Sequence, residues 1–337
     1  MSNFFPPSNY PSFFSTCHWI DAWQEAWADQ DEISVLNGSV DAKYCRRNFY
    51  QYRQRKFLGK SFITSFPAGI STTVSSSLRS EYFQLGNLLP DDFFDSIGNS
   101  NWDQLFIPDI LLDSCEYSNI CAAARVRNLT VLHRENSIAY AVNLRELNFT
   151  SYLNSLSGST RLKLFNKRKK LYEAGSVRVQ NLWPNLDEFI SIINQFHCAR
   201  WGVPCYKGRN LKQIVRFLQK ISGDGGEPDL SVVYCNNKAV SAVLDLSYRK
   251  RIYNIQSGYI EDFQKGTSLG TLHFGLQLEK AFNSDAEYYD FMAGNGKNSN
   301  YKKSLATHSA ELVSLMIVQS PILKALYFAK NKMDSIL

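Results

Sequence analysis

A lysine, two glycines and two hydroxyl side chains stand together where the sequence changes from a strand pattern to a helix pattern. The segment runs EDFQKGTSLGTLHFGLQLEKAF from residue 261, and its helical periodicity begins after Ser268. Amides in the first turn of a helix lack partners within it, and the helix dipole favours an anion beside them. Glycines allow close approach to the backbone. The junction therefore predicts a phosphate site made of Lys265, Gly266, Thr267, Ser268, Leu269 and Gly270.

The same junction also has a structural interpretation. Thr267 or Ser268 could cap an ordinary helix by accepting a bond from an amide two or three residues further on. The glycines would then belong to the loop that precedes the helix, and no ligand would bind there. The local residues alone leave both interpretations open.

Size and composition predict a folded protein outside the membrane. The 337 residues suffice for two medium domains or one large one, and a hydrophobic share of 44% can fill real cores. The longest apolar runs, such as 312–318, are far shorter than the ~20 residues of a membrane helix. The N-terminal MSNFFPPSNYPSFF lacks basic residues and does not resemble a signal peptide. We therefore expect a soluble, cytoplasmic protein.

Cysteine and histidine patterns predict neither a metal site nor a disulfide framework. The seven cysteines include no C-x-x-C pair, and the five histidines are scattered. The net charge of +6 is compatible with an anionic ligand but does not demand nucleic acid. One basic cluster, residues 161–170, is either a solvated helix face or a patch that attracts the phosphates of a cofactor or a tRNA.

The first half alternates helix and strand signals. An aromatic stripe predicts a helix over 15–27, and Ser114 is placed to cap a helix over 114–128. A polar turn at 134–137 would divide the segment 129–144 into two strands. The other expected elements are strands at 32–36, 56–65 and 102–110 and a helix that starts at Pro90.

The second half begins with a basic helix expected over 149–174. Three later strands, joined by the polar turns 236–237 and 249–250, predict antiparallel hairpins that lead into the helix after Ser268. The other expected elements are helices at 186–200, 210–221 and 321–332 and strands at 176–182, 288–294 and 311–318.

Both halves have strands, a central helix and a returning strand. This outline predicts an α/β (α+β) fold of two tandem units, 1–144 and 145–337, each a mixed, mostly antiparallel sheet flanked by helices. The second unit carries the plausible chemistry, and the first would shape a cleft for the acceptor.

An antiparallel meander that runs into such a helix resembles the GNAT acyltransferase superfamily. Several segments occur in the order seen in the BioF/CelD-like acetyltransferases, GNAT proteins related to the FemAB peptidyltransferases. The resemblance covers residues 145–320 and implies that both units are GNAT-like, the first of them without a donor site. The segments are LKLFNKRKKLYEAGSVRV, FHCARWG, KAVSAVLDLSYRKRIYNIQSGYIEDF, GTSLGTLHFGLQLEKAF and YYDFMAGNGKNSNYKKSLA.

The resemblance implies a reaction and a co-substrate. An acyl group would pass from acyl-coenzyme A, acetyl or longer, to an amine or hydroxyl of a small-molecule or glycan-precursor acceptor. The pyrophosphate of coenzyme A would lie at the strand-to-helix junction, and Ser257, Gly258 and Tyr259 of the preceding strand would complete its site. No metal is implied.

Transfer from a thioester needs a neutral nucleophile, stabilisation of the oxyanion and a proton for the leaving group. His197 or Asp290 could act as the base. Lys302 could offset charge on the tetrahedral intermediate, and Tyr301 could protonate the leaving thiolate.

Arg200 could bind a carboxylate or a phosphate through two bonds, and with Trp201 it forms the expected substrate-binding pair. Every one of these candidates also has a structural interpretation, such as a half-buried histidine on a carbonyl or a surface salt bridge. His273, among the leucines of the helix after the junction, is expected to be structural.

Two other functions stay open at this point. A Fem-like transferase would take an aminoacyl group from charged tRNA, with the basic cluster 161–170 holding the RNA backbone. A catalytically silent GNAT-like module would instead bind a metabolite or a partner. The sequence determines neither the acceptor nor the oligomeric state.

Overall fold

The computed structural model describes residues 12–27, 33–42, 45–53, 61–65, 78–84, 91, 94–95, 102–293 and 297–334. The chain forms two compact units: unit 1 comprises 1–138 and 310–337, and unit 2 comprises 139–309. The C-terminal segment belongs to unit 1 because β11 (His308–Val318) pairs with β4 (Gln104–Leu111). The expected α/β fold of two units is confirmed, whereas a domain division at 144/145 stays a prediction.

Unit 1 is built on a mixed sheet with the strand order β1-β2-β3-β4-β11. Only β3 and β4 are parallel among these neighbours. Helix α3 (Cys115–Val126) begins after Ser114, whose hydroxyl accepts a bond from the Tyr117 amide at 3.1 Å, as predicted. Its Ile120 packs with Leu105 of the sheet. The other elements of this unit are η1 (Phe13–Ser15), α1 (Cys17–Trp27), β1 (Ile33–Ala42), β2 (Cys45–Arg53), β3 (Ser61–Ser65) and α11 (Pro321–Asp334).

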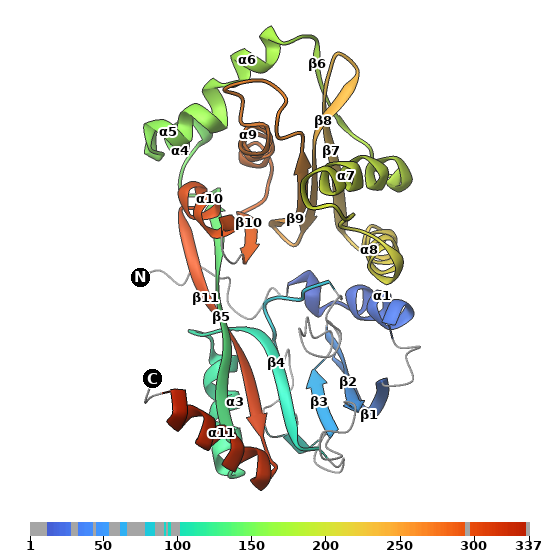
Figure 1. Ribbon diagram of the computed structural model, residues 1–337, viewed down its shortest axis with the longest axis vertical. Coiled ribbons are helices and arrows are strands. Elements are labelled where there is room, and N and C mark those ends of the chain that lie inside the picture. Colours follow the sequence, from blue (N-terminus) through green and yellow to red (C-terminus); the bar gives the residue numbers. More distant parts are fainter. Residues whose placement is uncertain are drawn as a thin grey trace. The chain divides into compact units, whose positions relative to one another are not determined.

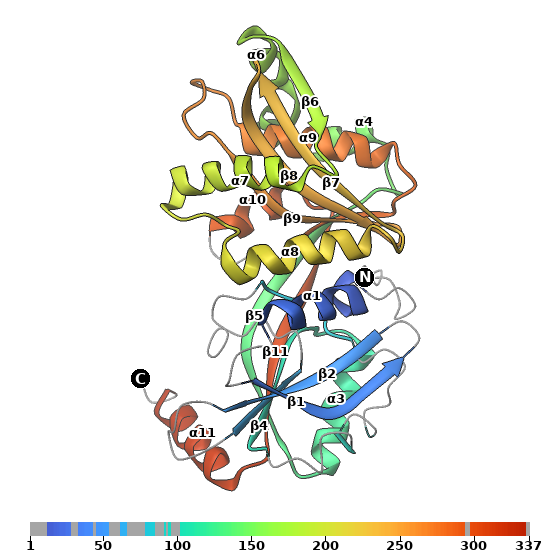
Figure 2. The same ribbon diagram turned by 90° about the vertical axis from the view of Figure 1, so that its right-hand side faces the viewer.

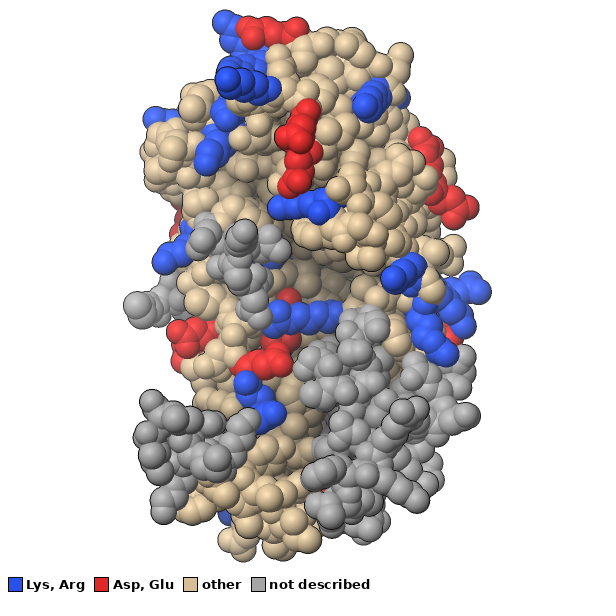
Figure 3. Space-filling view, in the orientation of Figure 1, with Lys and Arg blue, Asp and Glu red and all other residues tan. Residues whose placement is uncertain are grey.

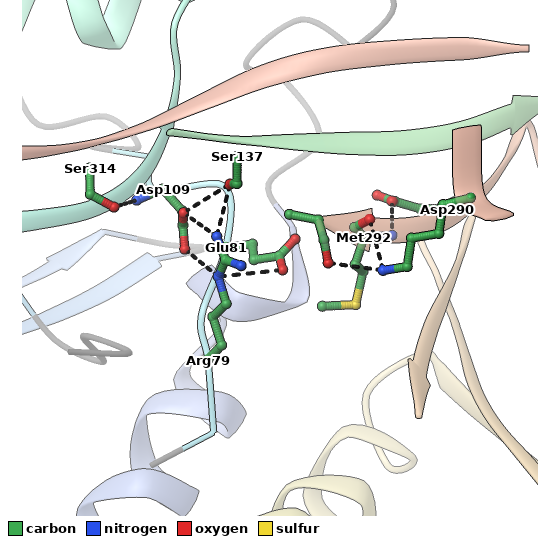
Figure 4. A network of polar contacts seen from close by, with 9 residues as sticks. Arg79, Glu81, Asp109, Ser137, Asp290, Met292 and Ser314 are labelled. Carbon is green, nitrogen blue, oxygen red and sulfur yellow. Dashed lines mark hydrogen bonds and ion pairs between the residues drawn. The ribbon is translucent and has the colours of Figure 1, made fainter. Parts of the chain in front are cut away.

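A charged network ties the strands of unit 1 together (Figure 4). Arg79 donates to both oxygens of the buried Asp109 carboxylate, at 2.8 and 2.6 Å, and to the Ser137 hydroxyl at 2.9 Å. The Asp109 amide donates to the Ser314 hydroxyl at 3.1 Å. These bonds connect β4 with β5 (Thr130–Asn143) and β11, and they satisfy a carboxylate that is costly to bury alone.

Unit 2 has the strand order β5-β10-β9-β8-β7-β6. The strands from β6 to β9 are antiparallel, whereas β10 is parallel to β9 and antiparallel to β5. The turns at 236–237 and 249–250 have positive φ at both residues, which is the predicted hairpin geometry. The strands are β6 (Val177–Asn181), β7 (Gly226–Cys235), β8 (Lys238–Tyr248), β9 (Arg251–Tyr259) and β10 (Tyr288–Ala293).

Helices cover both faces of this sheet (Figures 1 and 2). Helix α9 (Leu269–Phe282) lies on one face, and α7 (Leu186–Trp201) and α8 (Gly208–Ile221) lie on the other. Gly275 of α9 lets the π-helix η2 (Leu162–Asn166) approach closely, since a Cβ at position 275 would lie 2.1 Å from the Leu164 carbonyl oxygen. The remaining helices are α4 (Phe149–Ser155), α5 (Gly158–Arg161), α6 (Arg168–Glu173) and α10 (Lys297–Leu305).

Two sequence predictions about these elements are wrong. No turn interrupts 129–144, because the polar residues 133–136 are exposed positions of one continuous strand, β5. The helix expected over 149–174 is broken, because Leu156 is extended and Ser157 caps a new helix. In both cases tertiary contacts override local composition.

Buried polar groups hold α9 against the sheet. His273 lies between two strand hydroxyls, with Nε2 3.0 Å from Ser231 Oγ and Nδ1 2.8 Å from Ser241 Oγ. Burial lowers the pKa of His273 to about 3, so the imidazole is neutral at pH 7. Gln277 donates to the carboxylates of Asp229 and Asp245, at 2.8 and 3.0 Å. The position of α9 is thus set by bonds to β7 and β8.

We predict that replacing Gly275 by alanine destabilises the protein by about 1–3 kcal/mol, because η2 and α9 must move apart to admit the Cβ. Gly158→Ala is the control, since no atom lies within 4 Å of a Cβ there. Chemical denaturation should show a loss of stability in the first variant only. Equal midpoints would mean that the helix pair tolerates the extra methyl group.

We also predict that acid destabilises the protein through His273. As pH falls through about 6.5, the ordinary histidine pKa, the unfolded chain binds a proton that the folded chain does not bind until about pH 3. By pH 5 the free energy of unfolding should drop by about 2 kcal/mol relative to His273→Gln. Comparing the two proteins from pH 8 to 5 removes the effect of groups common to both, Asp245 among them. Parallel curves would contradict the prediction.

Candidate functional site

The two parallel strands of unit 2 part in the middle of the sheet. Pairing between β9 and β10 ends at Tyr253 opposite Asp290, although β9 remains paired with β8 as far as Tyr259. Beyond Asp290 the register of β10 against β5 also shifts, and Met292 has a φ of 61°. Within the described residues, the edge of β9 after Tyr253 therefore has no pairing with β10. An open strand edge can bind an extended ligand through its backbone.

The open edge leads directly to the N-terminus of α9. Ser268 occupies the N-cap position, but its side chain makes no capping bond. The Thr267 amide and hydroxyl both donate to the Gln264 carbonyl, at 3.1 and 2.7 Å. The interpretation of these hydroxyls as helix caps is therefore wrong. The first turn of α9 keeps amide donors for an anion.

Two lysines at the start of α6, Lys167 and Lys170, flank this turn. Lys167 Nζ donates to the Ser268 hydroxyl at 3.2 Å, and Lys170 Nζ lies 2.8 Å from the position of a Cβ on Gly266. Gly266 has a φ of 86°, a conformation that favours glycine. Burial, together with Lys170 and Lys163, lowers the pKa of Lys167. The lysines thus lie close together beside the loop although their positive charges repel one another.

Sequence reasoning identified the basic cluster 161–170 but did not assign its lysines to the junction. Lys167 and Lys170 are three residues apart and share a helix face, and this spacing is the signal that could have indicated a common target. Figure 3 shows Lys and Arg side chains gathered over the part of unit 2 that Figure 1 labels α5 and α6. Lys265, the lysine predicted for this site, is exposed in the loop.

The end of β9 packs between α7 and α9. A Cβ on Gly270 would lie 2.4 Å from the Tyr259 ring, so this ring lies directly on the first turn of α9. A Cβ on Gly258 would contact Phe196 of α7 at 3.1 Å. The Tyr259 hydroxyl accepts a bond from Arg200 Nη1 at 3.2 Å. The structure thus brings several predicted residues of β9, α7 and α9 together.

His197 lies on α7 above the open part of β9. Its Nε2 lies 3.1 Å from the Ser257 carbonyl oxygen, which can only accept, so Nε2 carries the proton. Nδ1 is then the nitrogen that can act as a base. Burial is the main cause that lowers the pKa of His197, and the side chain contacts the half-exposed Trp201 ring at a centroid distance of 4.6 Å.

Asp290, which Figure 4 labels beside Met292, holds the bend of β10 together with Lys302. The fully buried Asp290 carboxylate accepts the Met292 amide at 2.7 Å and forms an ion pair with Arg251 at 3.2 Å. Lys302 Nζ donates to the carbonyl oxygens of Met292 and Ala293, at 3.2 and 2.9 Å. These contacts give both residues a structural role at the strand parting, and their catalytic roles stay predictions.

Tyr301 of α10 stacks on Phe274 with a centroid distance of 5.7 Å. Burial raises the pKa of Tyr301 to about 12, with Tyr259 raising it further and Arg200 opposing the rise. The phenol therefore keeps its proton at neutral pH, as a proton donor must.

In the parts of the chain that the structure describes, no group of three or more His, Cys, Asp and Glu side chains could hold a metal ion. Across those same residues, no helix combines the length and the apolar character needed to cross a membrane.

Residues 158–303, all within unit 2, match the family model for an acetyltransferase (GNAT) domain. Solved structures extend the likeness to the whole fold. FemX is 10% identical, with 95% of this chain and 96% of that chain covered and a TM-score of 0.61. A conserved protein of unknown function from Bacteroides thetaiotaomicron is 9% identical, with coverages of 92% and 93% and a TM-score of 0.54.

The C-terminal domain of a putative lysylphosphatidylglycerol synthetase from Agrobacterium fabrum is 10% identical, with coverages of 94% and 95% and a TM-score of 0.50. No curated protein matches the chain in sequence. The chain thus contains a GNAT domain in unit 2 and has a fold similar to that of FemX, so the predicted resemblance is confirmed. This domain supports acyltransferase activity in the general sense.

We predict that Asp290→Asn costs about 3 kcal/mol of stability, because it leaves the buried Arg251 charge without its carboxylate. The asparagine can still accept the Met292 amide, so the loss isolates the ion pair. The double variant Asp290→Asn/Arg251→Met should recover part of the loss in thermal unfolding. A single variant as stable as the wild type would instead leave catalysis as the main role of Asp290.

Proposed function

We propose that the protein is an acyl-coenzyme A-dependent N- or O-acyltransferase that acts on a small-molecule or glycan-precursor acceptor. One observation carries the proposal: the open edge of β9 leads to a helix N-terminus that no side chain caps and that Lys167 and Lys170 flank. A diphosphate joined to an extended arm matches both the charge and the layout of these groups. The cytoplasmic location expected from the sequence stays part of the proposal.

The diphosphate would bind at the loop 265–270. The amides of the first turn of α9 donate to it, and the helix dipole adds a favourable potential. Lys167 and Lys170 supply positive charge from the other side of the loop. An anion between them would relieve the repulsion that contributes to the lowered pKa of Lys167.

The arm of the donor would then lie along β9, bonded to the backbone as an added strand is. Ser257, Gly258 and Tyr259 are the proposed contacts, and the thioester would reach the place where β9 and β10 part. Arg200 and Trp201 lie beside the same stretch of β9.

Acyl transfer forms a bond between the acceptor nitrogen or oxygen and the thioester carbonyl carbon, and breaks the carbon–sulfur bond. We propose His197 Nδ1 as the group that takes the acceptor's proton, because Nε2 donates its own proton to the Ser257 carbonyl oxygen. Tyr301 would give a proton to the thiolate, which is itself a tolerable leaving group with a pKa of about 8.5. Lys302 would offset charge on the oxyanion, and Asp290 is the second candidate base.

A Fem-like transferase with a tRNA-borne donor is the second candidate. The basic cluster 161–170 favours it, because phosphate backbones bind to dense Lys and Arg. The position of Lys167 and Lys170 at a short glycine-containing loop favours a single diphosphate. A silent binding module is the third possibility, and it predicts ligand binding without turnover.

The proposal predicts that coenzyme A binds to the purified, nuclease-treated protein and that Lys167→Gln weakens this binding about tenfold, the loss of one strong charged contact. Isothermal titration calorimetry measures both dissociation constants. Lys169→Gln is the control, since this lysine on the same helix is 85% exposed and faces Glu173.

The outcomes separate the three candidates. Equal weakening by both lysine variants would indicate general attraction to the basic cluster. Binding of charged tRNA without coenzyme A binding would favour the Fem-like reaction. Coenzyme A binding with no acyl transfer to a panel of amines and alcohols would favour the silent module.

A further inference from the structure

The Arg200 guanidinium lies at the meeting point of α7, β9 and the loop that precedes α9. Its Nε lies 2.9 Å from Glu261 Oε1, and its Nη1 donates to the Tyr259 hydroxyl at 3.2 Å. The guanidinium carbon lies 4.5 Å from the centre of the Trp201 ring and 5.4 Å from that of Tyr259. The rings of Trp201 and Tyr259 and the Tyr259 hydroxyl thus orient the guanidinium independently of its contact with Glu261.

Arg200 is one side chain away from the proposed phosphate site. The Tyr259 ring that receives its bond lies against Gly270, in the first turn of α9. Lys167 and Lys170 approach the same turn from α6. Arg200 is therefore a third cation of this region, contributed by a different helix.

Glu261 neutralises that third cation through an exchangeable contact. The Arg200 side chain is 33% exposed and that of Glu261 is 51% exposed, and ion pairs between such groups are weak. Glu261 comes two residues after the end of β9, in the loop that reaches α9, with Asp262 next to it. A phosphate, which can accept two bonds from a guanidinium, binds more strongly than one exposed carboxylate oxygen.

We propose that Arg200 is a donor-binding residue and that Glu261 is its internal competitor, which pairs with Arg200 until a phosphate of the donor replaces it. This inference rests on the proposed function and names the regulation of the same site. Glu261 thereby makes binding selective for phosphates. A donor that carries phosphates displaces Glu261 from Arg200, whereas a donor arm without phosphates does not. Trp201 and Tyr259 keep the guanidinium in place during the exchange.

The test compares coenzyme A with pantetheine, which has the arm but no phosphate, by calorimetry. Glu261→Gln should tighten coenzyme A binding about two- to fivefold, the value of one exposed ion pair, and leave pantetheine binding unchanged. Glu227→Gln, the same change at an exposed position of β7, should alter neither. In the Arg200→Gln background, Glu261→Gln should have no effect, because the competition needs the arginine.

The results distinguish this inference from the proposed function. If Lys167→Gln weakens coenzyme A binding but Glu261→Gln leaves it unchanged, the competitor role is wrong and the donor site stands. If Glu261→Gln tightens binding equally with and without Arg200, the effect is general charge and the assignment of Arg200 is wrong. If the wild-type protein does not bind coenzyme A at all, both proposals are wrong.

Discussion

Hydrogen bonding between the parallel strands β9 and β10 stops at Tyr253 and Asp290, and the candidate site depends on that parting. β9 cannot follow β10 because it stays paired with β8 as far as Tyr259. β10 bends instead, and the bend needs buried support: Asp290 accepts the Met292 amide, and Lys302 donates to the carbonyl oxygens that follow. The buried charged groups that support the bend of β10 thus leave the edge of β9 open to a ligand.

The polar groups of unit 2 fall into an inner and an outer set. The inner set, represented by His273 between Ser231 and Ser241, is fully buried and has protein partners, so it holds α9 rigidly. The outer set, represented by Lys167 and Arg200, makes exposed or partly exposed contacts that an anion can replace. A binding site needs both, because exchangeable charges select a ligand only when the backbone beneath them is fixed.

Local signals in the sequence were sufficient for many elements. Ser114 marks a helix start, and the turns 236–237 and 249–250 mark hairpins, because each depends on a few adjacent residues. Predictions failed where packing decides. The break in 149–174 is a case in point, since η2 is fitted against a glycine of α9 more than a hundred residues away. The sequence located the first turn of α9 correctly, but it left open whether a side chain caps the helix, and the structure shows no such bond from Ser268.

The sequence by itself determined the strand-to-helix junction, the antiparallel meander before it and the charge of the cluster 161–170, because these properties belong to neighbouring residues. Only the tertiary structure decided that Lys167 reaches Ser268, 101 positions later, that Glu261 pairs with Arg200, and that Asp290 is buried against Arg251. Such contacts follow from how helices pack on a twisted sheet. They leave no periodic trace in the sequence, because each depends on the whole arrangement of backbone between its partners.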